Sequence, residues 1–509
     1  MTLNLFHSPR QAWHWQTLLA CVLAGTVLGG VFHVQALWAL GIKWLCVAAL
    51  FAAVWQSRSV KHAALAGWAW SWGAHITGMG WLYVAMHDVG GLPVWLAGAG
   101  LVLLAGLLGI FAALSTGLVR WISKNSHKNA AFNLSPLSFA ATWVLGEWLR
   151  TWVLTGLPWM SLGYGFIDSP AAGFASSLGV LGVGASVFLA AGFGVQSFHR
   201  QALRGLAGLF ALGVLAYLGA QYRYTQPNGE PLSVALIQGN VPQTLKFDAD
   251  KSLGYMADYA KAAAARTEQL VVLPETALPA PWETLPEAIK LELKKTPGLL
   301  LVGTIGIARK NDVGQRYTNR LSTPLTSAPW HYDKSHLVPF GEVIPPGFQW
   351  FVDLMNMPLS SLAAGGQGQT NLKVNDLEIT PNICYEELFA HEWRGQTHTA
   401  HILLNTSNFG WYGKSSALPQ HANLARMRAL EFQKPYLSAT NNGSTLAVLP
   451  TGVVESQLAD HAQGVLSTRV QGMTGLTPYA RWGDWGAVIL AMLALLVLHL
   501  LHLRAGARR

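Results

Sequence analysis

The stretch Leu-Glu-Ile-Thr-Pro-Asn-Ile-Cys-Tyr-Glu-Glu at residues 377–387 decides the fold of the second half of this chain. Its first seven residues form an apolar, β-rich run that predicts a buried strand, and Cys384 follows directly. A residue in this position lies where a strand runs into a turn, which is where α/β folds expose nucleophiles. The thiolate is the reactive form of cysteine, so a neighbouring group must take up the thiol proton or stabilise the anion. Taken alone, such a cysteine is more often a small buried apolar residue.

The segment around this stretch, residues 227–479, alternates short β-rich runs with helix-like runs. This pattern predicts an α/β or α+β domain with one sizeable core. Pro-Asn-Gly-Glu-Pro at 227–231 is interpreted as the linker that precedes it. The predicted strands are Ser233–Gln238, Leu270–Leu273, Leu299–Gly303, Leu377–Cys384, Ile402–Asn405, Tyr436–Thr440 and Thr445–Leu449, and the predicted helices are Lys251–Ala265, Glu283–Lys295 and Gln420–Phe432.

The rest of the 509-residue chain has the composition of a membrane protein. Charged residues make up only 12% of the sequence and apolar residues 51%, which excludes a wholly soluble protein and intrinsic disorder. Three cysteines exclude a disulfide-stapled scaffold. A bilayer-spanning helix needs about 20 apolar residues. The predicted spans are Trp15–Val34, Leu37–Trp55, Ala63–Met86, Val94–Leu118, Leu137–Leu154, Ala171–Val195, Gly205–Tyr222 and Trp485–Leu503.

Basic residues alternate between the loops that join these spans. They precede span one, lie between spans two and three, four and five, and six and seven, and follow span eight, whereas the intervening loops carry no Lys or Arg. By the positive-inside rule both termini are cytoplasmic and residues 227–479 face the other side of the membrane. The predicted organisation is therefore a seven-helix transmembrane bundle over 1–226, an extracytoplasmic domain over 227–479, and a final transmembrane helix with a basic tail over 480–509. The net charge is +9, and much of the excess basic charge lies in these loops, where it sets the orientation of the protein in the membrane. No nucleic-acid partner is therefore expected.

Two further residues complete a candidate constellation with Cys384. Glu275 follows Val-Val-Leu-Pro at the end of a second predicted strand, and we expect it at the same sheet edge as Cys384, where it could act as a general base. Lys334, in Tyr-Asp-Lys-Ser-His, could lower the thiol pKa and stabilise an oxyanion. Taken alone, each is more often an ordinary solvated side chain.

Three sequence blocks in this order resemble the carbon–nitrogen hydrolase (nitrilase) superfamily. They are Leu-Pro-Glu-Thr-Ala at 273–277, Lys-Ser-His-Leu-Val-Pro-Phe-Gly-Glu at 334–342 and Ile-Cys-Tyr-Glu-Glu at 383–387. With seven spans before this domain and one after it, nearly the whole chain resembles the bacterial apolipoprotein N-acyltransferase family. Further matching stretches are 80–84, 152–159, 238–243, 425–431, 440–443 and 475–481.

The resemblance implies an αββα sandwich beside the helical membrane bundle, in the bacterial inner membrane with the catalytic domain in the periplasm. It implies the last step of lipoprotein maturation, in which a fatty acyl chain passes from a phospholipid, expected to be phosphatidylethanolamine, through a cysteine thioester. The implied acceptor is the α-amino group of the N-terminal S-diacylglyceryl cysteine of a lipoprotein. No metal or other cofactor is expected. The implied catalytic residues are Glu275, Lys334 and Cys384, and the implied auxiliary or substrate-binding residues are Glu342, Glu386, Tyr385, Phe247 and Trp411.

The chain departs from the family pattern at two places. After Ser407-Asn408 the family usually has Asp, but this chain continues Phe409-Gly410-Trp411, and Phe247 stands where Trp is common. We expect these changes to alter the shape of the acyl or acceptor pocket, not the reaction. The apolar stretch Phe340–Leu362 is interpreted as a membrane-dipping arm or lid, and Glu147 with Arg150 as an ion pair inside the fifth span or near the outer headgroups.

Two alternatives remain open from the residues themselves. A membrane-anchored amidase or nitrilase acting on a small soluble substrate would use the same three residues, but one span would be enough to anchor it. A transporter with a degenerate extracytoplasmic domain would explain the many spans, but not three intact sequence blocks. Replacing Cys384 by Ala would abolish function in the enzymes and leave transport unaffected.

Overall fold

The computed structural model describes residues 15–124, 135–198, 202–243, 249–309, 315–344, 347, 349 and 362–507. The chain divides into two compact units. The first contains residues up to 80, residues 95–221 and residues from 484 onward. The second contains residues 81–94 and 222–483, so a short segment from the apolar first half groups with the domain that carries the sequence blocks.

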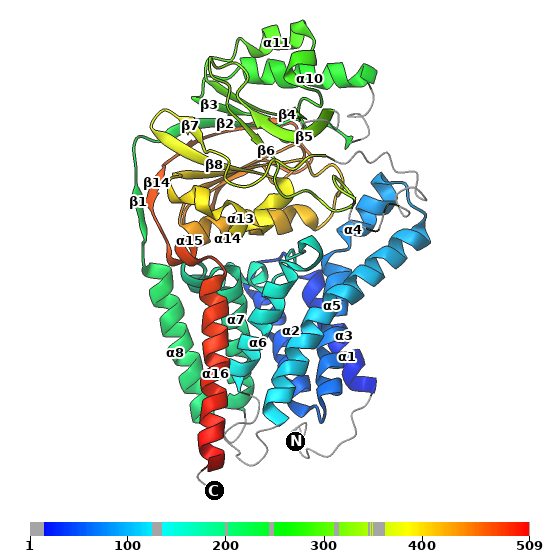
Figure 1. Cartoon of the computed structure of the whole chain (residues 1–509), viewed down its shortest axis with the longest axis vertical. Helices are drawn as coiled ribbons and strands as arrows, with labels where there is room; N and C mark the ends of the chain where they lie inside the picture. The colour runs from blue at the N-terminus through cyan, green and yellow to red at the C-terminus, as the bar shows by residue number, and fades with distance from the viewer. Residues whose placement is uncertain are drawn as a thin grey trace. The chain divides into compact units, whose positions relative to one another are not determined.

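The first unit is a bundle of α-helices that run side by side (Figure 1). Four of the described helices are long and apolar enough to cross a membrane: Leu37–Gln56, Val94–Ser123, Pro170–Ser197 and Ala202–Gln221. Two further helical stretches, Trp15–Gly30 and Trp485–Leu501, are also apolar but have fewer residues than these four. The helices of the unit are α1 (Trp15–Gly30), α2 (Leu37–Gln56), α3 (Val60–Gly78), α5 (Val94–Lys124), α6 (Pro136–Arg150), α7 (Ala175–Ser197), α8 (Ala202–Gln221) and α16 (Trp485–Ala507).

Small residues let α1 and α3 approach closely. A Cβ atom on Gly25 would lie 1.9 Å from the backbone oxygen of Trp70, and one on Gly73 would lie 2.4 Å from that of Val22. These distances are far below van der Waals contact, so neither position accepts a larger residue without separating the helices. Such small-residue contacts are typical of helix pairs in membranes, where close packing replaces the hydrophobic effect.

Three predicted spans end at least four residues earlier than expected. The first was expected to reach Val34, but α1 ends at Gly30. The third was expected to run to Met86, but α3 ends at Gly78, and Trp81 donates from Nε1 to Gln420 Oε1 at 3.1 Å within the second unit. The fifth was expected to reach Leu154, but α6 ends at Arg150 and Leu154 has a left-handed backbone with φ of 55°. In each case hydropathy continued past the end of the helix, and after α3 the apolar sequence forms a separate short helix, α4 (Trp81–Val84).

The second unit is built on two six-stranded sheets. Their strand orders are β13-β2-β3-β4-β5-β6 and β12-β11-β10-β9-β8-β7. In the first sheet β2, β3 and β4 are parallel, and in the second β8, β9 and β10 are parallel. The strands are β2 (Leu232–Gln238), β3 (Leu270–Val272), β4 (Leu299–Arg309), β5 (Gln315–Ser322), β6 (His331–Asp333), β7 (Leu372–Val374), β8 (Leu377–Ile383), β9 (Ile402–Ser407), β10 (Tyr436–Thr440), β11 (Leu446–Val448), β12 (Val454–Gln457) and β13 (Gly464–Val470).

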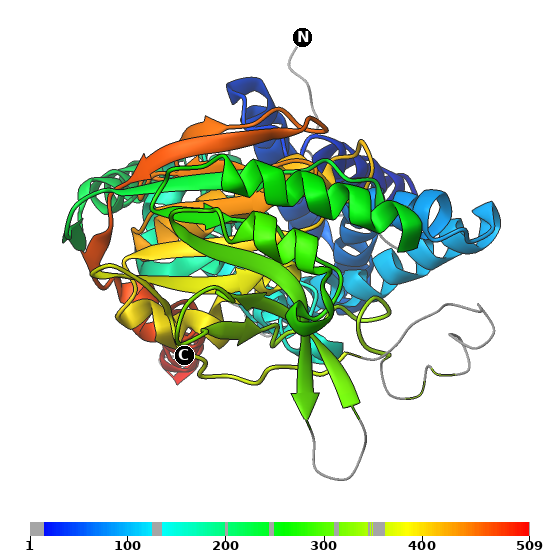
Figure 2. The ribbon, with the colours of Figure 1, turned by 90° about the horizontal axis from the view of Figure 1, so that it is seen from above.

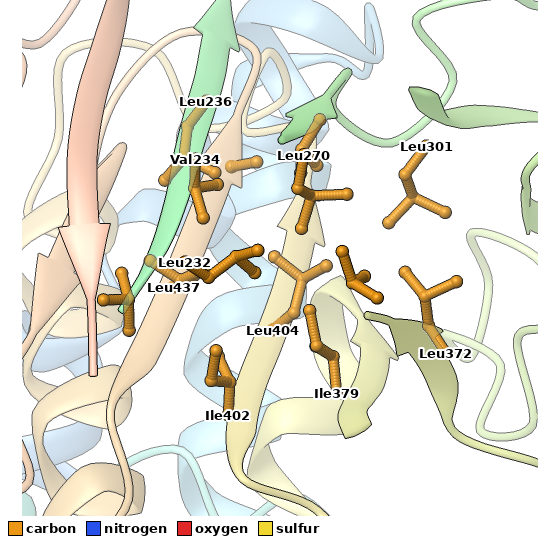
Figure 3. Close-up of a cluster of buried hydrophobic side chains, with 14 of the residues drawn as sticks. Leu232, Val234, Leu236, Leu270, Leu301, Leu372, Ile379, Ile402, Leu404 and Leu437 are labelled. Atoms are coloured by element: carbon orange, nitrogen blue, oxygen red, sulfur yellow. The ribbon is translucent and has the colours of Figure 1, made fainter. Parts of the chain in front are cut away.

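The two sheets pack face to face around an apolar core. Figure 3 shows Leu232 and Leu270 of the first sheet in one cluster with Leu437 and Leu404 of the second. A second core fills the space between the first sheet and helices α10 (Ala249–Ala264) and α11 (Glu287–Leu293), which cover that sheet in Figure 2. A third lies between the other sheet and helices α13 (Ala390–Trp393), α14 (Ala417–Phe432) and α15 (Pro478–Trp482). The unit is therefore a helix–sheet–sheet–helix sandwich, as the resemblance implied.

All seven predicted strands and the three predicted helices are present, with shifted ends. The expected helix Glu283–Lys295 begins only at Glu287, because Pro286 lies at its N-cap. The expected linker begins in a strand, since β1 (Thr225–Pro227) pairs with β14 (Met473–Gly475). The strands β5, β6, β7, β12 and β13 were not predicted. Most of them are more polar edge strands or hairpin partners, and β13 pairs with β2, which lies more than 200 residues earlier in the chain.

Candidate active site

The candidate residues all follow the ends of strands. Glu275 comes after β3, Lys334 directly after β6, Cys384 directly after β8 and Asn408 directly after β9. The expectation that Glu275 and Cys384 share a sheet edge is wrong, because β3 and β8 belong to different sheets. The two residues instead approach one another across the sandwich, where both sheets end. A site built in this way is held by both halves of the core.

Cys384 begins a tight turn at the end of β8. Its φ of 53° lies in the left-handed region, which costs free energy for a residue with a side chain and is common at functional sites. Asn405 of β9 donates from Nδ2 to the Cys384 carbonyl oxygen at 3.2 Å and so holds the turn. Burial raises the pKa of the Cys384 thiol, the Glu275 charge adds to this, and Lys334 opposes it. The resting group is therefore a neutral thiol that requires a base.

Lys334 is buried between two carboxylates. Its Nζ donates to Glu342 Oε1 at 2.9 Å and lies 3.5 Å from Glu275 Oε1, with only 1% of the side chain exposed. Burial alone would lower the Lys334 pKa, but the charges of Glu342 and Glu275 outweigh it and hold the pKa well above its usual value. Lys334 is thus a fixed ammonium ion close to the thiol, as an oxyanion donor must be.

Glu275 is held by three donors. Its Oε1 accepts from Asn319 Nδ2 at 2.7 Å and from Lys334, and its Oε2 accepts from the Asn408 backbone N–H at 2.8 Å. Asn319 also donates to Glu342 Oε1 at 3.0 Å, so one amide group bridges both carboxylates that surround Lys334. The orientation of Glu275 is therefore fixed by residues from both sheets.

Glu342 and Glu386 have different surroundings. Glu342 accepts from Lys334, and its Oε2 accepts from the Val338 backbone N–H at 2.9 Å, which closes the loop after Lys334. The hydrogen-bond partners of Glu386 lie instead on the segments next to Lys334 and Cys384. Glu386 accepts from the backbone N–H groups of Ser335 and Ile383 at 2.5 and 2.7 Å, and from the Tyr332 hydroxyl at 3.0 Å. Glu386 thus ties the loop that carries Lys334 to the turn that carries Cys384.

The remaining predicted site residues lie around this centre. Tyr385 is buried, with its ring 5.0 Å from that of Phe389 and 5.5 Å from that of His336, and burial raises its pKa. Trp411 lies on the turn after Asn408 with 39% of its side chain exposed. Phe247 lies outside the described residues, as does most of the stretch expected to form an arm.

The departure from the family pattern after Asn408 has a structural explanation. Phe409 is buried, and its ring makes an edge contact with His421 at 4.3 Å. His421 in turn lies 2.7 Å from Glu387, the residue two positions after Tyr385 in the nucleophile turn. Phe409 therefore packs against His421, which in turn contacts the nucleophile turn. Among the described residues, no group of His, Cys, Asp or Glu side chains is placed to hold a metal ion.

Asn319 is the main site residue that the sequence reasoning missed. It lies in the middle of β5, a strand that was not predicted, between Thr318 and Arg320, which both contact Asp333. Without the pairing of β5 with β6, nothing in the polar sequence of β5 indicated which side chains point inward.

Comparison with known proteins gives the same assignment for both units. The family model described as the apolipoprotein N-acyltransferase N-terminal domain matches residues 24–193, and the carbon–nitrogen hydrolase model matches residues 233–479. A solved structure of a mutant amidase from the nitrilase superfamily of Nesterenkonia AN1 is 16% identical, covers 48% of this chain and 92% of that chain, and has a TM-score of 0.35. A likeness this weak supports no further argument.

Relatives match almost from end to end. Apolipoprotein N-acyltransferase of Ralstonia nicotianae is 39% identical over 466 residues, covering 88% of each chain. The proteins of the same name from Chromobacterium violaceum and Bordetella bronchiseptica are 36% and 35% identical, covering 90% and 92% of this chain and 89% and 93% of theirs. At this identity and coverage, the chain belongs to the apolipoprotein N-acyltransferase family.

Proposed function

We propose that the chain transfers a fatty acyl group from a phospholipid to the α-amino group of the N-terminal S-diacylglyceryl cysteine of lipoproteins. Cys384 is the nucleophile, Glu275 the general base and Lys334 the oxyanion donor. The observation that carries this assignment is the buried contact of Lys334 with Glu275 and Glu342 beside the strained Cys384 turn. Glu342 and Glu386 position Lys334, and Tyr385, Phe247 and Trp411 shape the substrate pocket.

The first half-reaction is acylation of the enzyme. Glu275 takes the proton of the Cys384 thiol as sulfur attacks the ester carbonyl of the phospholipid, and Lys334 stabilises the tetrahedral oxyanion. When the intermediate collapses, the carbon–oxygen bond of the ester breaks and the lysophospholipid alkoxide takes the proton held by Glu275. The acyl group is then a thioester on Cys384. Phosphatidylethanolamine is the proposed donor.

The second half-reaction transfers this acyl group. The lipoprotein amine attacks the thioester, Glu275 takes up the amine proton, and Lys334 again stabilises the oxyanion. The carbon–sulfur bond breaks and the proton returns to sulfur, which regenerates the thiol. Because lysophospholipid leaves before the amine reacts, the kinetics are ping-pong.

The proposed topology has eight spans with both termini in the cytoplasm and the catalytic domain in the periplasm. It is supported by the alternating basic loops and by the four apolar helices of membrane length. We propose that residues 1–226 form the bundle, 227–479 the catalytic domain, and 480–509 the last span with its tail. This arrangement brings the site to the leaflet where both lipid substrates reside.

The test is the intact mass of purified protein after incubation with phosphatidylethanolamine vesicles, beside a Cys384→Ala variant. A fatty-acyl increment that hydroxylamine releases and the variant lacks would support the thioester. Addition of a diacylglyceryl peptide with a free N-terminus should then discharge it and acylate the peptide. If neither the increment nor lysophospholipid appears, the soluble-substrate amidase is the better explanation.

A further inference from the structure

Helix α6 is too short to cross a bilayer. Its 15 residues, from Pro136 to Arg150, extend about 22 Å at the usual rise, against a hydrocarbon core of about 30 Å. In the proposed topology its N-terminus lies on the cytoplasmic side. The chain that follows Arg150 therefore starts within the outer leaflet, not beyond it.

This following loop presents an apolar tip. Trp152, Val153 and Leu154, here called the 152–154 tip, have 49, 48 and 85% of their side chains exposed. Leu154, Thr155 and Gly156 have φ values of 55, 72 and 86°, a left-handed run that is costly for the first two residues. The stretch from Trp152 to Trp159 has no charged residue. The conformation thus directs apolar side chains outward at a free-energy cost.

A buried charge cluster lies where the loop leaves and rejoins the bundle. Arg150 Nη2 is 3.7 Å from Glu147 Oε1 and donates to Ser161 Oγ at 3.1 Å, so the expected ion pair is present. Glu147 Oε1 accepts from the Leu162 backbone N–H at 2.8 Å, and the Arg150 carbonyl accepts from the Leu157 N–H at 3.0 Å. Each end of the loop is therefore bonded to the last turn of α6.

His75 of α3 completes this cluster. Arg150 Nη1 lies 2.9 Å from His75 Nε2, and because guanidinium only donates, this ring nitrogen must accept. The proton is then on Nδ1, which donates to the Ser71 carbonyl at 2.8 Å. The imidazole is neutral, and the charges of Glu147 and Arg150 cancel. Non-helical backbone at membrane depth is tolerated only when its polar groups have hydrogen-bond partners within the protein, and this cluster provides such partners.

We propose that the 152–154 tip is embedded among the acyl chains of phospholipids in the outer leaflet and is held there by the His75–Glu147–Arg150 cluster. Its depth rests on the proposed topology. Embedded apolar side chains would regain, through contact with lipid, the free energy that the left-handed run costs. The tip then contributes a surface for acyl chains in the leaflet from which the donor is drawn.

The test uses spin labels on the full chain in phosphatidylethanolamine-containing vesicles. The background is Cys384→Ala, and Cys21 and Cys46 are only 3 and 7% exposed. Leu154→Cys is compared with Phe210→Cys on the apolar helix α8 and with Leu291→Cys on α11 of the second unit. Phe210 and Leu291 are 75 and 55% exposed in the unsubstituted protein. Collision with oxygen, which dissolves in lipid, is measured against collision with a water-soluble nickel chelate. We expect the oxygen-to-nickel ratio at 154 to match that at 210 and to exceed that at 291 several-fold.

A ratio at 154 equal to that at 291 would overturn the proposal. The role of the cluster is tested by adding Glu147→Gln, which should at least halve the ratio at 154 while leaving the ratio at 210 unchanged. Ser161→Ala removes only one hydrogen-bond acceptor of Arg150 and should lower the ratio at 154 by a smaller amount. This milder variant keeps the test valid if Glu147→Gln fails to fold. No change at 154 in either variant would refute the holding role. These readings need no turnover, so they are independent of whether the acyl transfer itself is correct.

Discussion

Replacing Asn319 by Ala tests whether the orientation of the catalytic carboxylate matters as much as its presence. The Asn319 amide donates to Glu275 at 2.7 Å and to Glu342 at 3.0 Å, and both carboxylates contact Lys334. The substitution leaves all three charges in place and removes only the bridge between the two acids. We therefore expect a loss of rate without loss of the nucleophile or base.

The magnitude follows from two hydrogen bonds to charged groups. Such bonds contribute about 1.5–3 kcal/mol each. Only the bond to Glu275 bears directly on the base, and if it is fully expressed in the transition state the acylation rate falls by roughly 10- to 100-fold. Among the described residues the Asn319 side-chain oxygen has no hydrogen-bond partner, so its removal costs no further bond there. Because both bonds are lost, we expect the unfolding free energy to fall by about 3–6 kcal/mol.

The assay is the rate of thioester formation, followed by intact mass under single-turnover conditions, together with the unfolding temperature in detergent. Thr318→Val is the matched control. Thr318 is the preceding residue of β5, is equally buried, and donates to Asp333 at 2.7 Å, a carboxylate that Arg320 also holds. It should lose stability but little rate. Equal acylation rates for the two variants would refute the proposed role of Asn319.

Three other outcomes follow from the site. Lys334→Met should slow thioester formation by about 10²–10³-fold, as loss of an oxyanion donor does, and retention of the wild-type rate would remove Lys334 from the mechanism. Because burial raises the Cys384 pKa, alkylation by iodoacetamide should be slower than that of a free thiol and should rise with pH to at least 9; a plateau near pH 8 would contradict this. Tyr332→Phe removes the hydroxyl that donates to Glu386 and should destabilise the domain by about 1–3 kcal/mol, measured as a lower unfolding temperature. An unchanged unfolding temperature would count against a stabilising role for this hydrogen bond.

The fold could be predicted where the sequence pattern is local. The parallel strands β8, β9 and β10 are almost wholly buried and each contains apolar residues that favour strands, and all three were predicted. The antiparallel strand β5 is half polar and is defined mainly by its partner β4, so no local signal revealed it. The early end of α3 at Gly78 was missed for the opposite reason, since hydropathy does not report where a helix ends.

The three proposed catalytic residues could be named from the sequence because each follows a recognisable block. Their meeting could not, since β3 and β8 lie in different sheets and only the packing of the two sheets brings Glu275 near Cys384. Asn319 was missed with the strand that carries it. Sequence blocks thus name the proposed catalytic residues, whereas a residue that orients them, such as Asn319, becomes evident only from the pairing of β5 with β4 and β6.

The charges around Cys384 limit how its proton can move. Glu275 and Glu342 face the single ammonium of Lys334, so the cluster as carboxylates and ammonium already has a net charge of −1. Ionising the thiol into solvent would bring the net charge to −2. Burial of the thiol is the main cause that raises the Cys384 pKa, and the charges of Glu275 and Glu342 add to it. If the proton instead passes to Glu275 as sulfur attacks, the negative charge moves from the carboxylate to the carbonyl oxygen beside Lys334, and the net charge does not change. In the proposed mechanism, proton transfer to Glu275 and attack by sulfur are therefore coupled.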